Sequence, residues 1–268
     1  MALRSAPAAP ILSVIVPAWN EAEGIAACMQ ALHQHLGPLR PELIIVDDGS
    51  TDGTHRVAAD WIARHPDVDA RVISLPHRGK GVAVRAGVRR SRGNDVVYID
   101  ADMDIPASEI DRLLASRSRD GTDVVVGSKR ALTWRQLPGP VSRRLISVTF
   151  SWLVSQLFHL PVRDTQTGVK LFPGPWLRSA VAEARVAGFL FDVELLAMAV
   201  RAGLRLREEP VRVTMRRAAS RIGVRDCLRC VGELALLVRV LGDGPPVPVA
   251  LGPEASAHGQ AALGHGRG

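Results

Sequence analysis

Short apolar runs alternate with segments of helical periodicity along the first half of the chain. The runs are rich in Val and Ile and end at polar turns, which is typical of strands buried in a sheet. They predict strands over 11–17, 42–47, 70–75, 95–100 and 123–127. The segments between them predict helices that end near residue 36 and span 54–64, 82–92 and 108–116. This alternation indicates an α/β fold with a mostly parallel sheet flanked by helices.

The alternation is less regular beyond about residue 127. The pattern predicts a loop over 132–140, an apolar helix over 145–162, a helix around 189–201, a strand over 204–214 and an amphipathic C-terminal helix over 227–241. We interpret these segments as a continuation that covers the same sheet, so a single domain is expected over 11–241, with halves 11–130 and 131–241. Residues 1–10 are expected to be a flexible N-terminus, and the Gly- and Pro-rich residues 242–268 a disordered tail.

The composition is that of an ordinary globular core. Of the 268 residues, 47% are hydrophobic and 23% charged, which excludes wholesale disorder and a fibrous repeat. The formal charge is +7, and the 34 basic residues include only three lysines, Lys80, Lys129 and Lys170. We interpret the arginine excess first as a background of codon usage and second as a hint of anionic partners. Only 4% of the residues are aromatic, which leaves few platforms for bases, so no nucleic-acid partner is expected.

Two apolar helical segments raise the question of a membrane. The uncharged run 145–162 approaches the length of a span, but seven polar or proline residues interrupt it, which favours a buried or interfacial helix. Packing against the core explains this run or the helix over 227–241 alone. Together, in a basic protein, they also fit peripheral attachment to an anionic membrane, with contact between 141–160 and a partner subunit as the alternative. The protein is expected to be cytoplasmic, free or attached to the inner face of the cell membrane, with its oligomeric state open.

Polar clusters follow three of the predicted strands at the point where each strand ends. They are Asn20-Glu21, Asp47 to Ser50, and Asp100 to Asp104. Ligands of open α/β sheets bind at the carboxyl ends of the strands, so these clusters form the candidate site. Acidic groups gathered at one edge repel one another, and a bound cation or a hydrogen-bonding ligand would offset that repulsion.

The string Asp100-Ala101-Asp102 directly follows a buried strand. Two carboxylates separated by one residue can face a hard divalent cation where the chain turns, and Asp104 can add a third oxygen. Such a cation would bridge the phosphates of a nucleoside diphosphate and stabilise it as a leaving group. The competing interpretation is an acidic turn that caps the helix beginning near Pro106, and the motif alone does not decide between the two.

Two further strings point to an anionic ligand with a base or ribose. The string from Asp47 to Thr54 offers carboxylates as hydrogen-bond acceptors and Gly49 for close backbone approach, whereas capping a helix needs only one such residue. The turn from His77 to Gly81 offers exposed amides and Lys80 to an anionic group. It is neither a Walker A loop nor a GxGxxG fingerprint, which disfavours a dehydrogenase.

Taken together, four ordered strings resemble the family 2 glycosyltransferases of the GT-A fold. They are SVIVPAWNEA at 13–22, LIIVDDGSTDGT at 43–54, RGKGVAVRAG at 78–87 and VVYIDADMDIP at 96–106. The second half looks most like the dolichyl-phosphate glucosyltransferase and polyprenyl-phosphate sugar synthase group. That finer likeness is carried by GSKR at 127–130, RDTQTGVKLF at 163–172, FDVELL at 191–196 and EPVRV at 209–213.

The resemblance implies a role for each matching position. Donor binding is implied for Pro17, Asn20, Glu21, Asp48, Lys80, Gly81, Asp100, Ala101 and Gln166. Binding of Mg²⁺ or Mn²⁺ is implied for Asp100, Asp102 and Asp104. Catalytic positions on the acceptor side are implied for Asp192, Glu194, Arg130 and Arg221, the two arginines gripping an acceptor phosphate.

The activity that the resemblance implies is an inverting, metal-dependent transfer of a hexose, such as glucose, from a nucleotide sugar, such as a UDP-sugar, to a polyprenyl or dolichyl phosphate. The first half would bind the donor and the second half the acceptor. A phosphate monoester has a second pKa of about 6 and reaches the site largely ionised, so it needs no base. A hydroxyl acceptor would need one, and Asp192 or Glu194 is the candidate. Transfer to a hydroxyl of a soluble acceptor, and ligand binding without catalysis, are the alternatives.

Overall fold

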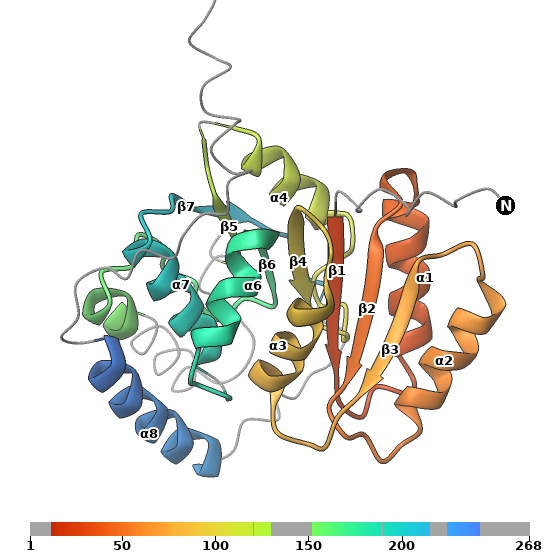
Figure 1. Cartoon of the computed structure of the whole chain (residues 1–268), viewed down its shortest axis with the longest axis horizontal. Helices are drawn as coiled ribbons and strands as arrows, with labels where there is room; N and C mark the ends of the chain where they lie inside the picture. The colour runs from red at the N-terminus through yellow and green to blue at the C-terminus, as the bar shows by residue number, and fades with distance from the viewer. Residues whose placement is uncertain (1–11, 120, 130–151, 189, 215–223, 242–268) are drawn as a thin grey trace, which may run out of the picture.

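A seven-stranded sheet runs through the part of the chain that the structure describes (Figure 1). The computed structural model describes residues 12–119, 121–129, 152–188, 190–214 and 224–241. The strands are β1 (Leu12–Ala18), β2 (Glu42–Asp47), β3 (Ala70–Ser74), β4 (Asp95–Ile99), β5 (Val124–Ser128), β6 (Val169–Pro173) and β7 (Leu206–Pro210). Their order across the sheet is β3-β2-β1-β4-β6-β5-β7, and the predicted α/β fold with a mostly parallel sheet is confirmed.

Strand β6 is the one that the sequence pattern did not predict. It runs antiparallel to both of its neighbours, with Tyr98 of β4 opposite Lys170 and Val125 of β5 opposite Leu171. All other pairs in the described sheet are parallel: β1 with β2 and β4, β2 with β3, and β5 with β7. The chain therefore returns into the middle of the sheet after β5, and β6 lies beside the loop that follows β4.

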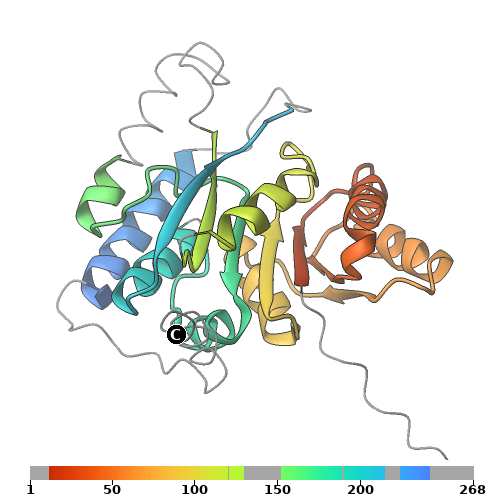
Figure 2. The same cartoon turned by 90° about the horizontal axis from the view of Figure 1, so that it is seen from above.

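Helices cover both faces of the sheet, as the two views show (Figures 1 and 2). One face carries α1 (Ile25–Leu36), α2 (Thr54–Arg64) and α4 (Glu109–Arg117). The other carries α3 (Lys80–Arg90), α6 (Gly174–Glu183), α7 (Phe191–Arg201) and α8 (Val224–Leu241). Neighbouring residues of β1 point to opposite cores, Ile15 toward α3 and Val14 and Val16 toward α1. Burial on both faces explains why these strands are continuous apolar runs.

The second half differs from the sequence prediction in its boundaries. Helix α6 was not predicted, because Gly174-Pro175 has the composition of a break; the proline stands in the first helical turn, where its missing N–H costs nothing. The strand predicted over 204–214 is confined to β7. Residues 152–157 of the predicted apolar helix are helical, and α8 begins at Val224, three residues before the predicted start.

Several predictions fall outside the described residues. They concern the flexible N-terminus at 1–10, the loop at 132–140, the beginning of the apolar helix, the tail at 242–268, and the two arginines Arg130 and Arg221. The division into halves at residue 130 stays a prediction. None of the helices in the described residues is both long and apolar enough to cross a membrane.

Candidate active site

The loops that follow β1 and β2 are tied together at the carboxyl edge of the sheet. The Ser50 hydroxyl accepts the N–H of Asn20 at 2.9 Å, and the Asn20 side-chain oxygen accepts the N–H of Thr51 at 2.9 Å. The Thr54 hydroxyl accepts the N–H of Glu21 at 2.8 Å. Asn20 has a φ of 52°, a left-handed conformation that asparagine tolerates better than most residues. The structure thus brings Asn20 and Glu21 beside the string that follows β2.

Asp48 anchors the turn that leads into α3. Its carboxylate accepts the N–H of Arg78 at 2.9 Å and that of Gly79 at 2.8 Å, and Nδ1 of His77 lies 2.9 Å from Oδ2. Beside it, Gly49 has a φ of 69°, and a Cβ there would lie 2.5 Å from the His77 nitrogen. The close approach of the two turns therefore requires glycine. Asp48 is 3% exposed and acts on this edge by shaping the turn.

An aromatic pair that sequence reasoning missed lies at the same edge. The rings of Trp19 and His77 stack with centroids 4.6 Å apart and an angle of 21° between their planes. Trp19 remains 39% exposed, and Pro17 before it on β1 is half-buried. The only signal in the sequence was a large aromatic residue within a polar string. The pair closes the β1 loop against the 77–79 turn and leaves one aromatic face toward solvent.

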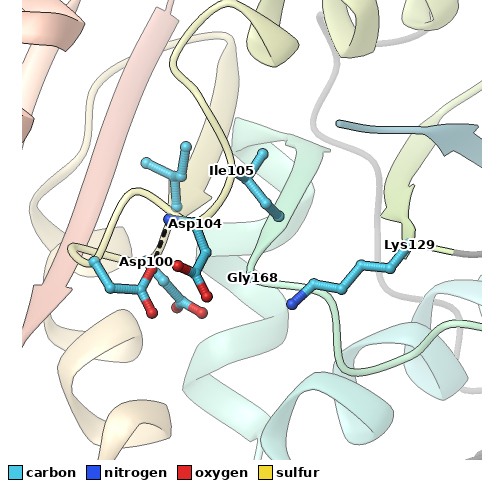
Figure 3. A pocket seen from close by; sticks show the side chains of 7 residues that line it. Asp100, Asp104, Ile105, Lys129 and Gly168 are labelled. Atoms are coloured by element: carbon cyan, nitrogen blue, oxygen red, sulfur yellow. Dashed lines mark hydrogen bonds between the residues drawn. The ribbon is translucent and has the colours of Figure 1, made fainter. Parts of the chain in front are cut away.

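The acidic string after β4 lines a small hollow together with one residue just after β5 and one just before β6 (Figure 3). The lining residues are Ile99, Asp100, Asp102, Asp104, Ile105, Lys129 and Gly168. The Asp102 side chain accepts the N–H of Asp104 at 3.1 Å, which folds the string back on itself. Lys129, after β5, extends toward the carboxylates from the opposite side of the hollow (Figure 3). The predicted carboxylates therefore do face one space.

Three aspartates and one lysine line the hollow, so its lining has an excess of negative charge. Burial raises the pKa of Asp102 above its ordinary value, and the neighbouring charges of Asp100 and Asp104 add to this effect. Carboxylate oxygens are the ligands that Mg²⁺ and Mn²⁺ prefer, and a cation would relieve the repulsion. Within the described residues, no three or more His, Cys, Asp or Glu side chains converge as a metal site. The carboxylate oxygens are of the type that a hard cation prefers, but Asp100, Asp102 and Asp104 do not converge as a three-ligand site in this structure.

Lys80 begins α3 and pairs with Asp100, one of the residues that line the hollow. Its ammonium lies 2.6 Å from Oδ1 of Asp100 and 4.0 Å from Oδ2 of Asp192. Burial works to lower the pKa of Lys80, but attraction to Asp100 and Asp192 outweighs it and raises the pKa above its usual value. The next residue, Gly81, must be glycine, because a Cβ there would lie 2.6 Å from the Ala187 carbonyl oxygen. The donor residues predicted near the diphosphate thus meet the acidic string.

Asp192, on the first turn of α7, is enclosed by three polar side chains. The Tyr98 hydroxyl donates to its Oδ1 at 2.5 Å, and the Lys170 ammonium lies 3.4 Å from the same oxygen. Burial works to raise the pKa of Asp192, but Lys170 and Lys80 outweigh it and hold the pKa below its usual value. Burial lowers the pKa of Lys170, which is wholly enclosed. Asp192 therefore belongs to the site as an ionised, firmly held carboxylate.

Glu194, two residues after Asp192 in the same first turn of α7, is bound to the loop before the helix. Its two oxygens accept the N–H groups of Arg185 at 2.7 Å and Val186 at 2.8 Å, and the side chain is 1% exposed. Burial raises the pKa of Glu194, and these two hydrogen bonds work against that rise. Both oxygens are engaged by the loop before α7, so this carboxylate anchors the loop and is not aimed at an acceptor.

The segment before β6 lies against the acidic string. The Asp100 N–H donates to the Gly168 carbonyl at 3.0 Å, and a Cβ on Gly168 would lie 2.3 Å from Oδ2 of Asp100. In the same segment, the side-chain nitrogen of Gln166 is buried without a hydrogen-bond partner in the structure. Ala101, 4% exposed, belongs to the apolar core on the α1 face. Gln166 is therefore the predicted donor residue with a polar atom left for a ligand.

The sequence profile described as Glycosyl transferase family 2 matches residues 13–180, which is more than half of the chain. The chain belongs to this glycosyltransferase family. The match runs from β1 to the middle of α6 and includes the loops that carry the acidic string, Asp48 and Lys80. It confirms the resemblance drawn from the sequence motifs, and with the relatives below it confirms the expected enzyme class, a glycosyltransferase of the hexosyltransferase type.

Curated family 2 relatives are similar over much of the chain. The Dolichyl-phosphate beta-glucosyltransferase of Drosophila melanogaster is 34% identical over 218 residues, which cover 76% of this chain and 67% of the relative. The human protein of the same name is 31% identical over 202 residues, covering 70% of this chain and 62% of the relative. The chain spans about two thirds of the length of these relatives.

Solved structures share the fold. Glucosyl-3-phosphoglycerate synthase from Mycobacterium tuberculosis, in complex with Mn²⁺, uridine diphosphate and glucosyl-3-phosphoglycerate, has a TM-score of 0.65 at 23% identity, covering 88% of this chain and 81% of that one. A complex of the same enzyme with Mn²⁺, uridine diphosphate and phosphoglyceric acid has a TM-score of 0.66 at 24% identity, covering 88% of this chain and 80% of that one. The likeness agrees with the GT-A fold that the sequence motifs implied.

Proposed function

We propose that this family 2 glycosyltransferase transfers a hexose, in the simplest case glucose, from a nucleoside diphosphate sugar to a polyprenyl phosphate with inversion at the anomeric carbon. The observation that carries the proposal is the hollow at the carboxyl edge of the sheet, which Asp100, Asp102, Asp104 and Lys129 line and where Lys80 pairs with Asp100. Carboxylates for a divalent cation beside two ammonium groups suit a ligand that carries a diphosphate. The relatives named as dolichyl-phosphate glucosyltransferases support the sugar and the acceptor.

The aspartates would hold Mg²⁺ or Mn²⁺, which supplies positive charge to a diphosphate leaving group when it is bound. Lys80 would bind the same diphosphate. Its ammonium lies between the carboxylates of Asp100 and Asp192 at the N-terminus of α3, which supports this role. Gln166, with its unpartnered buried nitrogen, is placed to donate to the sugar. Aligning two anionic substrates and balancing their charges are then the main tasks of the protein.

The surroundings of Asp192 favour a phosphate acceptor over a hydroxyl. A hydroxyl acceptor needs a base that is free to receive a proton, but Oδ1 of Asp192 is held by Tyr98 and Lys170, and Oδ2 faces Lys80. A phosphate monoester is already largely ionised and attacks without such a base. Transfer to a soluble hydroxyl therefore enters the test below as the competing outcome.

The test is transfer of labelled glucose from UDP-glucose to a polyprenyl phosphate in detergent micelles, with and without chelator. We expect a glycolipid product that disappears with chelator and with Asp100→Asn. The matched control is Asp111→Asn, because Asp111 is an exposed aspartate paired with His35 on the α1 and α4 side. Product with water-soluble hydroxyl acceptors and none with polyprenyl phosphate would overturn the lipid acceptor. Transfer that survives the chelator would overturn the metal dependence.

We also propose peripheral attachment to the cytoplasmic face of the membrane, through the helical residues 152–157 and α8. Trp152, Leu153 and Leu157 are 58%, 46% and 43% exposed, which is unusual for large apolar side chains clustered on one short segment. Exposed Leu236 and Val238 lie on α8, and the positive charge of the chain suits anionic lipids. Flotation with anionic vesicles tests this attachment.

In the flotation experiment, Leu153→Glu with Leu157→Glu should abolish attachment, whereas Leu39→Glu should not. Leu39 is a suitable control because it is 45% exposed and lies in the short 3-10 turn (Gly37–Leu39) after α1, away from both segments. Equal flotation of both variants would refute the assignment of these residues.

A further inference from the structure

The side chain of Lys170, including its ammonium group, is fully buried on strand β6, the strand that the sequence pattern did not predict. Lys170 is 0% exposed and stands opposite Tyr98 of β4 in the strand register, so both side chains project from the same face. Burying a charged group is costly unless it is paired, so an apolar residue at this position would be the simpler solution for a core. Because burial of this charge is unfavourable, its presence suggests that the charge has a function.

The contacts of Lys170 connect the interior to the hollow. Its ammonium donates to the Thr167 carbonyl at 2.7 Å and lies 3.4 Å from Oδ1 of Asp192. The Tyr98 hydroxyl donates to the same oxygen at 2.5 Å. The other oxygen, Oδ2, lies 4.0 Å from the ammonium of Lys80. One oxygen of the Asp192 carboxylate is therefore held by Tyr98 and Lys170 from inside the protein, and the other faces Lys80.

Four charges form a row of alternating sign. Asp100 and Lys80 are 2.6 Å apart, Lys80 and Asp192 4.0 Å, and Asp192 and Lys170 3.4 Å. The ammonium groups of Lys80 and Lys170 also lie 6.0 Å and 5.5 Å from the centroid of the Tyr98 ring. Lys80 thus interacts with a near carboxylate, Asp100, and with a more distant one, Asp192. The contacts of Asp192 with Tyr98 and Lys170 hold it at that distance.

We propose that Lys170 is a positioning residue for the donor site: together with the Tyr98 hydroxyl it restrains Asp192, and through Asp192 it keeps Lys80 directed toward Asp100 and the donor diphosphate. The proposal rests on the proposed function and extends it to a residue that does not touch the donor. Among the described residues, Lys170 and Lys80 are the two lysines that pair with Asp192, so without the Lys170 charge Lys80 is left as its partner. A closer Asp192–Lys80 pair would withdraw the Lys80 ammonium from Asp100.

The alternative is that Lys170 only stabilises the fold. Its hydrogen bond to Thr167 supports the segment that carries Gln166, and this contact alone would make substitutions destabilising. The two roles differ in what a second substitution does. If Lys170 acts through Asp192, removing the Asp192 charge removes the pull on Lys80, so the two substitutions are not additive in donor binding. If the role is only structural, Lys170→Met lowers the melting temperature without weakening UDP binding, so there is no effect on UDP binding for the second substitution to remove.

The experiment measures dissociation constants for UDP by calorimetry, alongside melting temperatures, for the full chain carrying Lys170→Met, Asp192→Asn or both. Methionine keeps the length and shape of the lysine stem without its charge. We expect Lys170→Met to weaken UDP binding about tenfold and the double variant to bind about as well as Asp192→Asn alone, which is a strongly non-additive result. Leu171→Ala is the control, since Leu171 is buried on the same strand and faces the opposite core. It should lower the melting temperature without weakening UDP binding.

A second variant keeps the proposal open to refutation should Lys170→Met not fold. Tyr98→Phe removes the other inner contact of Asp192 and no charge, and it should weaken UDP binding by a smaller factor in the same direction. Unchanged UDP affinity in Lys170→Met or in Tyr98→Phe, or additive effects in the double variant, would overturn the role of Lys170. Failure of the wild-type protein to bind UDP or GDP would instead overturn the proposed function, because the wild-type protein contains every residue of the row.

Discussion

Adding one methyl group at Gly168 should disable the site while leaving the fold nearly intact. A Cβ at this position would lie 2.3 Å from Oδ2 and 2.8 Å from Cγ of Asp100, where ordinary contacts begin at 3.4 Å. The Asp100 carboxylate must therefore move by about 1 Å, and a displacement of that size at reacting groups can cost about 100-fold in rate. The side chain of Asp100 is 36% exposed and can rotate outward, so we expect the stability loss to stay near the lower end of the about 1–3 kcal/mol typical of overpacking.

The assay compares kcat/KM of Gly168→Ala and the wild-type protein over a titration with Mn²⁺, together with urea unfolding. We expect the rate to fall about 100-fold and the half-saturating Mn²⁺ concentration to rise, because Asp100 is one of the carboxylates that would hold the cation. Gly232→Ala on α8 is the control, since a Cβ there meets nothing within 4 Å. That variant should keep full activity and gain about 0.5–1 kcal/mol of stability. Wild-type rate and wild-type Mn²⁺ dependence in Gly168→Ala would refute the reasoning.

Three further substitutions test other parts of the chain. Asp48→Ala removes the acceptor of two backbone N–H groups in the 77–79 turn, so the donor KM should rise about tenfold with little change in kcat, measured by initial rates. The pKa of Glu42 is lower than usual: burial works to raise it, but hydrogen bonds from Ser13 and Arg92 outweigh that effect. The ionised form of Glu42 therefore stabilises the fold. Glu42→Gln should therefore lower the melting temperature at about pH 7, and the difference should shrink as the pH falls through the pKa of Glu42; an equal difference at about pH 3 would contradict this. Glu233→Gln weakens a hydrogen bond of 2.9 Å from the Leu190 N–H, so amide exchange at the start of α7 should quicken, whereas unchanged protection there would show that α8 is held by apolar contacts alone.

The first half of the fold was predictable because its signals are local. Each of its strands is an apolar run, and each acidic or glycine-containing turn stands directly after a strand, so the general topology of parallel sheets already brings Asn20, Asp48 and Asp100 to one edge. The close backbone approach at Gly49 followed from the same string. For these residues, sequence position and place in the fold are closely linked.

The second half was less predictable because its structure depends on partners distant in sequence. Strand β6 has only five residues and contains a lysine, so its pattern does not indicate a buried strand; the charge is tolerated because Asp192 of α7 pairs with it. The contact between Trp19 and His77 likewise joins two turns that no local pattern relates. The resemblance grouped Asp192 with Glu194, but the side chains at these two positions of α7 point to different partners, which only the packed structure reveals.

Because β6 is inserted between β4 and β5, the sheet cannot be completed in the order in which the chain is synthesised. When residue 128 has left the ribosome, β4 has one neighbour and β5 has none; β4 must wait for residues 169–173, and β5 for residues 169–173 and 206–210. An N-terminal fragment that ends near residue 130 would leave one edge of β4 and both edges of β5 unpaired, and unpaired strand edges are a recognised cause of aggregation. Chimaeras that exchange acceptor segments between relatives should therefore place their junctions before β5 or after β7, so that β5, β6 and β7 are inherited together.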